Sequence, residues 1–223
     1  TAKKFGLGNK VFDGLFLDEK NGLVPSTKWK RNNLGTGWVL GETLLTGIGQ
    51  GYIQTTPVQL CLMTAQLANG GFKIYPRLTF DNNYENYETV KNKMLQKTIE
   101  KQNDKIGLIE TSKELIFSSK NRHDILFRNQ ENVKFVLEAM YGATNEVFGT
   151  SYKSRIDDKK YQFAGKTGTA QVKKITEEAR KLDLKTSQIP YEERDHALYI
   201  AYGPYIKPRY AISIIVEHGG SGS

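Results

Sequence analysis

The folding possibilities of this chain are limited chiefly by one strand-like octapeptide in its last third, Phe163-Ala164-Gly165-Lys166-Thr167-Gly168-Thr169-Ala170. Two further segments rich in β-branched and aromatic residues follow it, at residues 197–202 and 209–216. Runs of this composition between turn residues are typical of β-strands. Sheets with one covered face are commonly antiparallel. The sequence therefore predicts an antiparallel sheet in which residues 163–170 form a bordering strand.

A first amphipathic helix is predicted to begin after Thr56, which can cap it, with Pro57 in the first helical position. The run Asn69-Gly70-Gly71 is expected to end it. Its apolar stripe is expected to face the core and consists of Val58, Cys61, Leu62, Ala65, Leu67 and Ala68.

A second helix is predicted over about residues 132–141, before Gly142 breaks the pattern. Its apolar residues recur at helical spacing, at Val133, Val136, Leu137 and Met140. The turn at residues 149–151 can start a further helix.

Residues 4–38 are rich in turn residues, and we expect them to be mostly loop. Residues 47–52 read Gly-Ile-Gly-Gln-Gly-Tyr but lack the final glycine of a dinucleotide-binding loop, so no nucleotide cofactor is predicted. These glycines are expected to let a tight turn pack closely against a neighbouring segment.

Two stretches are strongly polar, residues 81–105 and 173–194. We interpret both as exposed insertions. For residues 173–194 a role in partner contact or substrate gating stays open beside the simpler reading of a solvated loop.

The chain has 223 residues and a net charge of +8, enough for one domain or a large part of one. No segment concentrates arginine with interleaved aromatic residues, so we predict no nucleic-acid partner. The positive charge suits either an acidic polymer or an anionic membrane surface. No apolar run approaches the ~20 residues of a membrane span, so we expect a soluble piece whose anchor, if it has one, is not in this sequence.

No metal site is predicted, because His123, His196 and His218 lack ligand spacing. Asp195 and His196 are adjacent and would point to opposite faces of a strand, which favours a structural His196 over an acid–base pair. Cys61 lies in an apolar helical run and is expected to be an inert core residue.

The tripeptide Lys166-Thr167-Gly168 is one of three motifs shared by penicillin-binding proteins and class A β-lactamases. With the segments around it, the chain resembles the C-terminal part of the transpeptidase domain of the penicillin-binding protein 2 family, the elongation-specific class B enzymes. The resemblance covers almost the whole chain outside the two polar stretches. It rests on residues 5–8, 23–26 with Trp29, 40–43, 47–52, 55–57, 68–71, 164–170, 195–198 and 217–220.

This resemblance implies an incomplete penicillin-recognising α/β (α+β) fold, with an antiparallel sheet and helices packed on its faces. Residues 1–223 would be the C-terminal portion of a single transpeptidase domain. The implied activity is peptidoglycan D,D-transpeptidation through a serine acyl-enzyme. The implied partners are D-Ala-D-Ala stem peptides, β-lactams and membrane proteins of the elongation complex, in a periplasmic domain anchored to the inner membrane.

The resemblance also implies roles for the motif strand. Lys166 would supply a positive charge to the substrate carboxylate, and the Thr167 and Thr169 hydroxyls would donate hydrogen bonds on that side. Gly168 would allow close approach between strands. The backbone N–H of Thr169 would complete the oxyanion hole, where one donor contributes about 3 kcal/mol.

The family's nucleophile motif, Ser-x-x-Lys, is absent, because no serine of this chain is followed three positions later by lysine. Residues 119–121 spell the Ser-x-Asn motif but follow the segment at 47–52 instead of preceding it, and we interpret the match as coincidence. We therefore expect the parent protein to be an enzyme and this chain alone to be inactive.

Two alternatives remain open at this point. The chain can be a non-catalytic module that binds wall peptides or a partner, or it can be a relative of β-lactamases and β-lactam sensors. In each case an incomplete domain would leave apolar surface open, so we also expect self-association.

Overall fold

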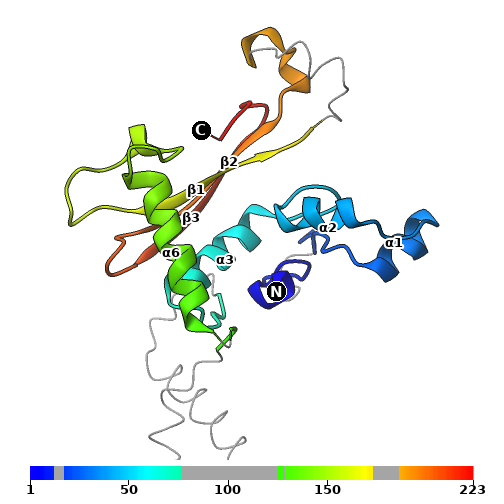
Figure 1. Cartoon of the computed structure of the whole chain (residues 1–223), viewed down its shortest axis with the longest axis horizontal. Coiled ribbons are helices and arrows are strands. Elements are labelled where there is room, and N and C mark those ends of the chain that lie inside the picture. The colour runs from blue at the N-terminus through cyan, green and yellow to red at the C-terminus, as the bar shows by residue number, and fades with distance from the viewer. Residues whose placement is uncertain (13–17, 77–124, 128, 173–185, 223) are drawn as a thin grey trace, which may run out of the picture. The chain divides into compact units, whose positions relative to one another are not determined.

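The computed structural model describes residues 1–12, 18–76, 125–127, 129–172 and 186–222. The chain divides into two compact units, and the first, residues 1–74 with 126–223, contains every element described below. Its longer helices and its strands are α1 (Thr27–Leu34), α2 (Leu40–Gly47), α3 (Pro57–Ala68), α6 (Gln130–Asn145), β1 (Ala164–Ala170), β2 (His196–Gly203) and β3 (Tyr210–Val216) (Figure 1). Single 3₁₀ turns lie at Ala2–Phe5, Tyr152–Ser154, Thr186–Gln188 and Tyr191–Glu193.

The three strands form one antiparallel sheet in the order β1-β2-β3. In its register Lys166 pairs with Ile200, and Ile200 pairs with Ser213. The predicted sheet is confirmed, with strand ends within one residue of those predicted. Among the described strands β1 is at the edge, so no described strand pairs with the outer side of the motif residues.

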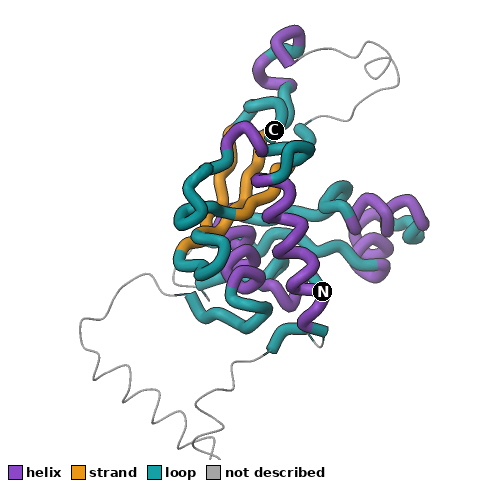
Figure 2. Tube along the Cα trace, turned by 60° about the vertical axis from the view of Figure 1, so that its left-hand side comes forward, coloured by secondary structure: helices purple, strands orange, loops and turns teal. Residues whose placement is uncertain are grey.

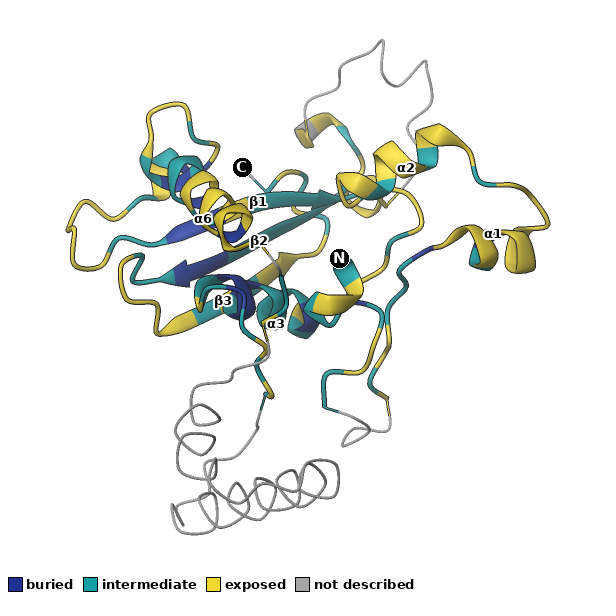
Figure 3. Ribbon diagram, turned by 60° about the horizontal axis from the view of Figure 1, so that its bottom comes forward, coloured by how far each residue is buried: buried dark blue, intermediate teal, exposed yellow. Residues whose placement is uncertain are grey.

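Helices α3 and α6 cover the sheet from the side on which the core lies (Figures 2 and 3). The core joins Met140 of α6 to Ala164 and Tyr202 of the sheet, and Ala68 of α3 packs against the same cluster. Successive residues of a strand point to opposite faces, so this core uses only alternate residues of each strand. The predicted α/β class, with helices packed on an antiparallel sheet, is confirmed.

The other residues of β3 face away from this core and leave an apolar strip at the surface. Tyr210, Ile212, Ile214 and Val216 are 73%, 45%, 47% and 53% exposed. They alternate with the core-facing residues of the same strand. We call these four residues the β3 strip.

Helix α3 begins and ends as predicted. Thr56 caps it by accepting a hydrogen bond from the Gln59 N–H at 3.3 Å, and Asn69 follows its last residue. Its buried face is partly polar, which the apolar stripe did not predict. Gln59 donates to the carbonyls of Asn9 and Asn21 at 2.6 and 2.8 Å, and thus holds the preceding loops on the helix.

Helix α6 continues through Gly142 to Asn145, so the prediction that Gly142 ends it was wrong. Glycine costs about 1 kcal/mol in a helix relative to alanine. The last turn recovers this through contacts with the segment that leads into β1: Thr144 accepts from the Gly165 N–H at 3.0 Å, and Asn145 donates to the Phe163 carbonyl at 2.9 Å. Two such bonds contribute about 1 kcal/mol each.

The described residues within 4–38 are mostly loop, as predicted, and α1 at residues 27–34 is the helix that this prediction did not include. Ser26 caps this helix by accepting from the Trp29 N–H at 3.1 Å. The interpretation of residues 24–26 as a simple turn missed this signal. Residues 149–151 are followed by a single 3₁₀ turn, as the sequence allowed.

The predicted insertion at residues 81–105 lies outside the described residues, as do residues 173–185 of the second one. The described remainder, residues 186–194, contains two short 3₁₀ turns. At the flanks of the longer gap, the Leu126 N–H donates to the Gly71 carbonyl at 2.9 Å. Gly71 is also close to Phe127 and Val133, so the two flanks meet at one place.

Candidate functional site

Lys166 lies on the edge strand with its side chain exposed. Its ammonium donates to the carbonyl of Thr167 at 2.9 Å and to the Thr167 hydroxyl at 3.3 Å. The hydroxyls of Thr150 and Thr167 are 3.1 Å apart. The structure thus places a cation and two hydroxyls together at the open edge of β1, donors of the kind that bind a carboxylate.

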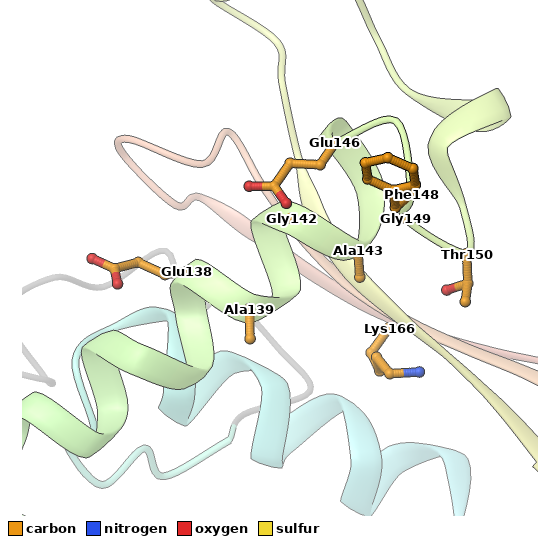
Figure 4. Close-up of a pocket in the computed structure, with 9 residues that line it drawn as sticks. All are labelled: Glu138, Ala139, Gly142, Ala143, Glu146, Phe148, Gly149, Thr150 and Lys166. Carbon is orange, nitrogen blue, oxygen red and sulfur yellow. The ribbon is translucent and has the colours of Figure 1, made fainter.

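A pocket of about 410 Å³ opens beside Lys166, between α6, the loop after it and β1 (Figure 4). Figure 4 shows the Lys166 ammonium nearest to Thr150, while the carboxylates of Glu138 and Glu146 are turned away from it. Neither carboxylate therefore lies between the Lys166 ammonium and Thr150. The lining residues are Glu138, Ala139, Gly142, Ala143, Glu146, Phe148, Gly149, Thr150 and Lys166.

Three hydroxyl groups support the first half of the motif strand. The Tyr199 hydroxyl donates to Ser151 at 3.1 Å and lies 3.2 Å from the Thr144 hydroxyl. Thr144 is fully buried and accepts the Gly165 N–H. A Cβ on Gly165 would overlap the Tyr199 phenol, so this position requires glycine. Sequence reasoning missed this cluster, because its members are far apart in the chain and follow no period.

Among the other predicted site residues, Gly168 and Thr169 lie further along the same strand. A Cβ on Gly168 would lie 3.3 Å from the Leu198 Cβ, tighter than an ordinary contact. The carbonyl of Thr169 accepts a hydrogen bond from the Gln50 side chain at 3.2 Å. All four motif residues therefore border the same edge, and Gln50 is a neighbour that the sequence did not predict.

The segment at residues 47–52 was predicted to use its glycines for close packing, and this was wrong for Gly47 and Gly49. A Cβ on either of them would meet nothing within 4 Å, and one on Gly51 would make an ordinary contact with Leu45 at 3.7 Å. Gly49 and Gly51 instead have φ values of 78° and 80°. Only glycine adopts this left-handed backbone at little cost, so the two glycines shape the turn.

An ion pair joins α1 to α2 just before this segment. The Lys30 ammonium lies 2.5 Å from the Glu42 carboxylate, with side chains 8% and 13% exposed. Lys30 also donates to the Gly37 carbonyl at 2.7 Å. The hydrogen bond from Lys30, followed by that from the Val39 N–H, lowers the pKa of Glu42 below its ordinary value.

This lowered pKa predicts a pH-dependent contribution to stability. A carboxyl whose pKa is lower in the folded state stabilises the fold above its unfolded pKa, and the contribution is lost as pH falls through the folded pKa. Glu42→Gln should therefore narrow the stability difference between neutral pH and pH values below the ordinary glutamate pKa. Urea titrations at several pH values, followed by the fluorescence of Trp29 and Trp38, measure this.

Glu138→Gln is the matched control for that titration. Its partner Lys134 is 3.8 Å away and both side chains are more than half exposed, and such pairs contribute little. Equal pH profiles for the Glu42→Gln variant and the unaltered chain would contradict the prediction.

The histidine and cysteine contacts are structural. His196 Nδ1 accepts a hydrogen bond from the backbone N–H of His218 at 2.9 Å. The Cys61 thiol donates to the Ala211 carbonyl at 3.4 Å, and burial raises its pKa, which disfavours the reactive thiolate. His123 and residues 119–121 lie outside the described residues.

Within the ranges that the structure describes, no three His, Cys, Asp or Glu side chains gather as a metal site. In the same ranges none of the helices combines the length and the apolar character of a membrane span.

An antiparallel sheet that carries Lys-Thr-Gly at its open edge, with helices on its core side, places this chain in the penicillin-recognising class of α/β proteins. The sequence model of the penicillin binding protein transpeptidase domain matches residues 1–223. The chain belongs to this penicillin-binding protein transpeptidase family.

Similar proteins support the finer resemblance to penicillin-binding protein 2. The peptidoglycan D,D-transpeptidase MrdA of Salmonella typhimurium is 32% identical over 221 residues, 98% of this chain. Its counterpart in Haemophilus influenzae is 30% identical over 222 residues, 99% of this chain. The chain spans about 30% of the first of these relatives and 29% of the second.

Two solved structures show the same arrangement. Penicillin-binding protein 2 of Pseudomonas aeruginosa, in complex with WCK 5153, has a TM-score of 0.67 and 32% identity, over 99% of this chain and 39% of that one. Penicillin-binding protein 2 of Helicobacter pylori, in complex with MreC, has a TM-score of 0.67 and is 28% identical in sequence. The match covers 98% of this chain and 31% of that one. The predicted family is confirmed.

Proposed function

We propose that this chain is the C-terminal portion of the transpeptidase domain of a peptidoglycan D,D-transpeptidase that acts in cell-wall elongation. The observation that carries the proposal is the exposed Lys166 ammonium at the open edge of β1, beside a pocket. The activity named for its MrdA relatives supports it. The rest of the enzyme, including the serine nucleophile, would come from the part of such a protein that this chain does not match.

The proposed reaction is acyl transfer in two steps. A serine oxygen bonds to the carbonyl carbon of the penultimate D-alanine while a base takes the serine proton. The C–N bond to the last D-alanine then breaks, and the leaving nitrogen takes up a proton. The nitrogen of an amine on a neighbouring peptidoglycan strand next bonds to the ester carbon, the C–O bond to serine breaks, and the proton lost by the amine returns to the serine oxygen.

In this reaction the residues of β1 bind and orient the substrate. Lys166 holds the terminal carboxylate of the stem peptide, or that of a β-lactam, and the hydroxyls of Thr167 and Thr169 donate to the same side. Gly168 keeps the strand surface free of a side chain. The Thr169 N–H donates to the oxygen that becomes negative during attack.

The test uses a fluorescent penicillin and two proteins, the full-length transpeptidase that carries this chain and the 223-residue chain alone. We expect a labelled band for the full-length protein that disappears after preincubation with unlabelled penicillin, and none for the chain. Stoichiometric labelling of the chain alone would contradict the assignment of the nucleophile to another part. An unlabelled full-length protein would contradict the enzymatic function.

A second candidate function is a module without chemistry that binds wall peptides through Lys166. The absence of Ser-x-x-Lys from the 223 residues favours it. The reading frame upstream of Thr1 separates the two candidates, since an in-frame Ser-x-x-Lys and a membrane segment are expected only for the enzyme.

We also propose partners and a location by analogy. The relative from Helicobacter pylori forms a complex with MreC, and we expect the parent protein to bind a membrane protein of the elongation complex. Its place would be the periplasm, on an inner-membrane anchor. Separated from the rest of the domain, the chain is expected to self-associate through the β3 strip. Light scattering on the 223-residue chain prepared for the penicillin test measures this self-association.

A further inference from the structure

Gln50 connects the glycine-rich turn after α2 to the motif strand. Its Nε2 donates to the Thr169 carbonyl at 3.2 Å, across 119 residues of sequence. Its own backbone N–H donates to the Leu45 carbonyl at 2.8 Å. With Gly49 and Gly51 in the left-handed region on either side, the turn holds the Gln50 side chain toward β1.

The bonding pattern along β1 shows which way Thr169 faces. Three alternate residues, Gly165, Thr167 and Thr169, bond through one backbone group to a partner outside β2: the Thr144 hydroxyl, the Lys166 ammonium and the Gln50 amide, respectively. In antiparallel pairs a residue turns both its N–H and its C=O either toward the partner strand or away from it. The N–H of Thr169 therefore points to the same edge as the carbonyl that Gln50 holds.

We propose that Gln50 is a positioning residue for acyl transfer: it fixes Thr169 so that its N–H meets the oxygen that becomes negative. This inference rests on the function proposed above. As the serine oxygen bonds to the acyl carbon, the electron pair of the C=O bond moves onto that oxygen, which the N–H then stabilises. The Thr169 carbonyl faces the same edge and would repel the negative charge on the substrate oxygen. The side-chain amide of Gln50, which donates to this carbonyl, reduces that repulsion.

The support for Gln50 extends back to the ion pair between α1 and α2. Helix α2 ends at Gly47, and its last turn supplies the Leu45 carbonyl that holds the backbone of Gln50. Lys30 and Glu42 tie the start of α2 to α1. A largely buried ion pair and a backbone hydrogen bond thus precede Gln50, and the Gln50 amide connects this segment to the edge of β1.

The experiment measures acylation of the full-length transpeptidase by a fluorescent penicillin over a range of concentrations. This separates the first-order acylation constant from the dissociation constant Kd. Gln50→Met keeps the length of the side chain without its donor, and Gln50→Glu places an anionic acceptor against the Thr169 carbonyl. Asn33→Ala is the matched control, since its amide also donates to a carbonyl, that of Trp29, but on the exposed side of α1.

We expect Gln50→Met to lower the acylation constant about five- to tenfold, the effect of one hydrogen bond. Gln50→Glu should lower it further, and Asn33→Ala should leave it unchanged. Kd of both Gln50 variants should match that of the wild type, and the unfolding temperature should fall only slightly, as expected for the loss of one hydrogen bond. A role in folding alone would instead lower the unfolding temperature and leave the acylation constant unchanged.

Two outcomes would overturn the inference: wild-type acylation constants in both Gln50 variants, or losses that appear only in Kd together with a lowered unfolding temperature. A wild-type protein that penicillin does not acylate is a separate result, because it refutes the proposed function itself. The wild-type measurement thus distinguishes the two failures.

Discussion

Lys166→Ala in the full-length transpeptidase is expected to lower the efficiency of acylation by penicillin on the order of 100-fold. A hydrogen bond to a charged group contributes up to about 3 kcal/mol, and the proposed carboxylate contact requires this ammonium. Because the side chain is exposed and donates only to Thr167 of its own strand, the unfolding temperature should change little. Rates of fluorescent labelling, compared at equal protein concentration, measure the effect.

Lys159→Ala is the matched control, since it removes the same charge from an exposed position outside the pocket. It should label at the wild-type rate. Lys166→Arg keeps the charge in a larger head group and should retain part of the activity. Labelling of the alanine variant within twofold of the wild type would remove Lys166 from the proposed site.

Gly165→Ala is expected to destabilise the fold by about 1–3 kcal/mol, the usual cost of overpacking. The new Cβ would overlap the Tyr199 hydroxyl and lie 2.6 Å from the ring carbon that bears it. The ring cannot move aside without losing its bonds to Ser151 and Thr144. Urea titration of the full-length protein measures the loss.

Gly41→Ala is the control for backbone effects, because a Cβ there meets nothing within 4 Å and the residue lies inside α2. Alanine should be neutral or slightly stabilising at this position. A second variant, Gly165→Ala with Tyr199→Leu, removes the hydroxyl and should recover part of the loss. Equal stability of Gly165→Ala and the wild type would show that the strand tolerates the side chain.

The sequence predicted the parts of the fold that rest on local signals. Helix α3 has a capping threonine, a proline in its first turn and a terminating asparagine, and it appears with the predicted bounds. The three strands follow from composition and turn spacing. Helix α1 was missed because its local signal, the capping Ser26, was interpreted as part of a turn. The Lys30–Glu42 ion pair and a ring contact between Trp29 and Tyr52 at 5.3 Å give this helix further support that the sequence does not show.

The candidate site also has residues that the sequence predicted and residues that it did not. Lys166 and its neighbours are contiguous, so a short motif reveals them. Thr144, Ser151 and Gln50 reach the same strand from other elements through single polar contacts. Such contacts leave no periodic pattern in the sequence. The glycine at position 165, next to the motif lysine, is the local sign that a side chain, here that of Tyr199, packs against the strand.

The hydrogen bond between Gly71 and Leu126 has a consequence for how proteins of this kind change over time. It closes the unit at the point where the polypeptide leaves and returns, so residues added or removed between those positions need not disturb α3, α6 or the sheet. The entropic cost of closing a loop rises only with the logarithm of the loop's length. Evolution can therefore vary the length of this stretch at little thermodynamic cost, and a laboratory can use the same position to insert a reporter.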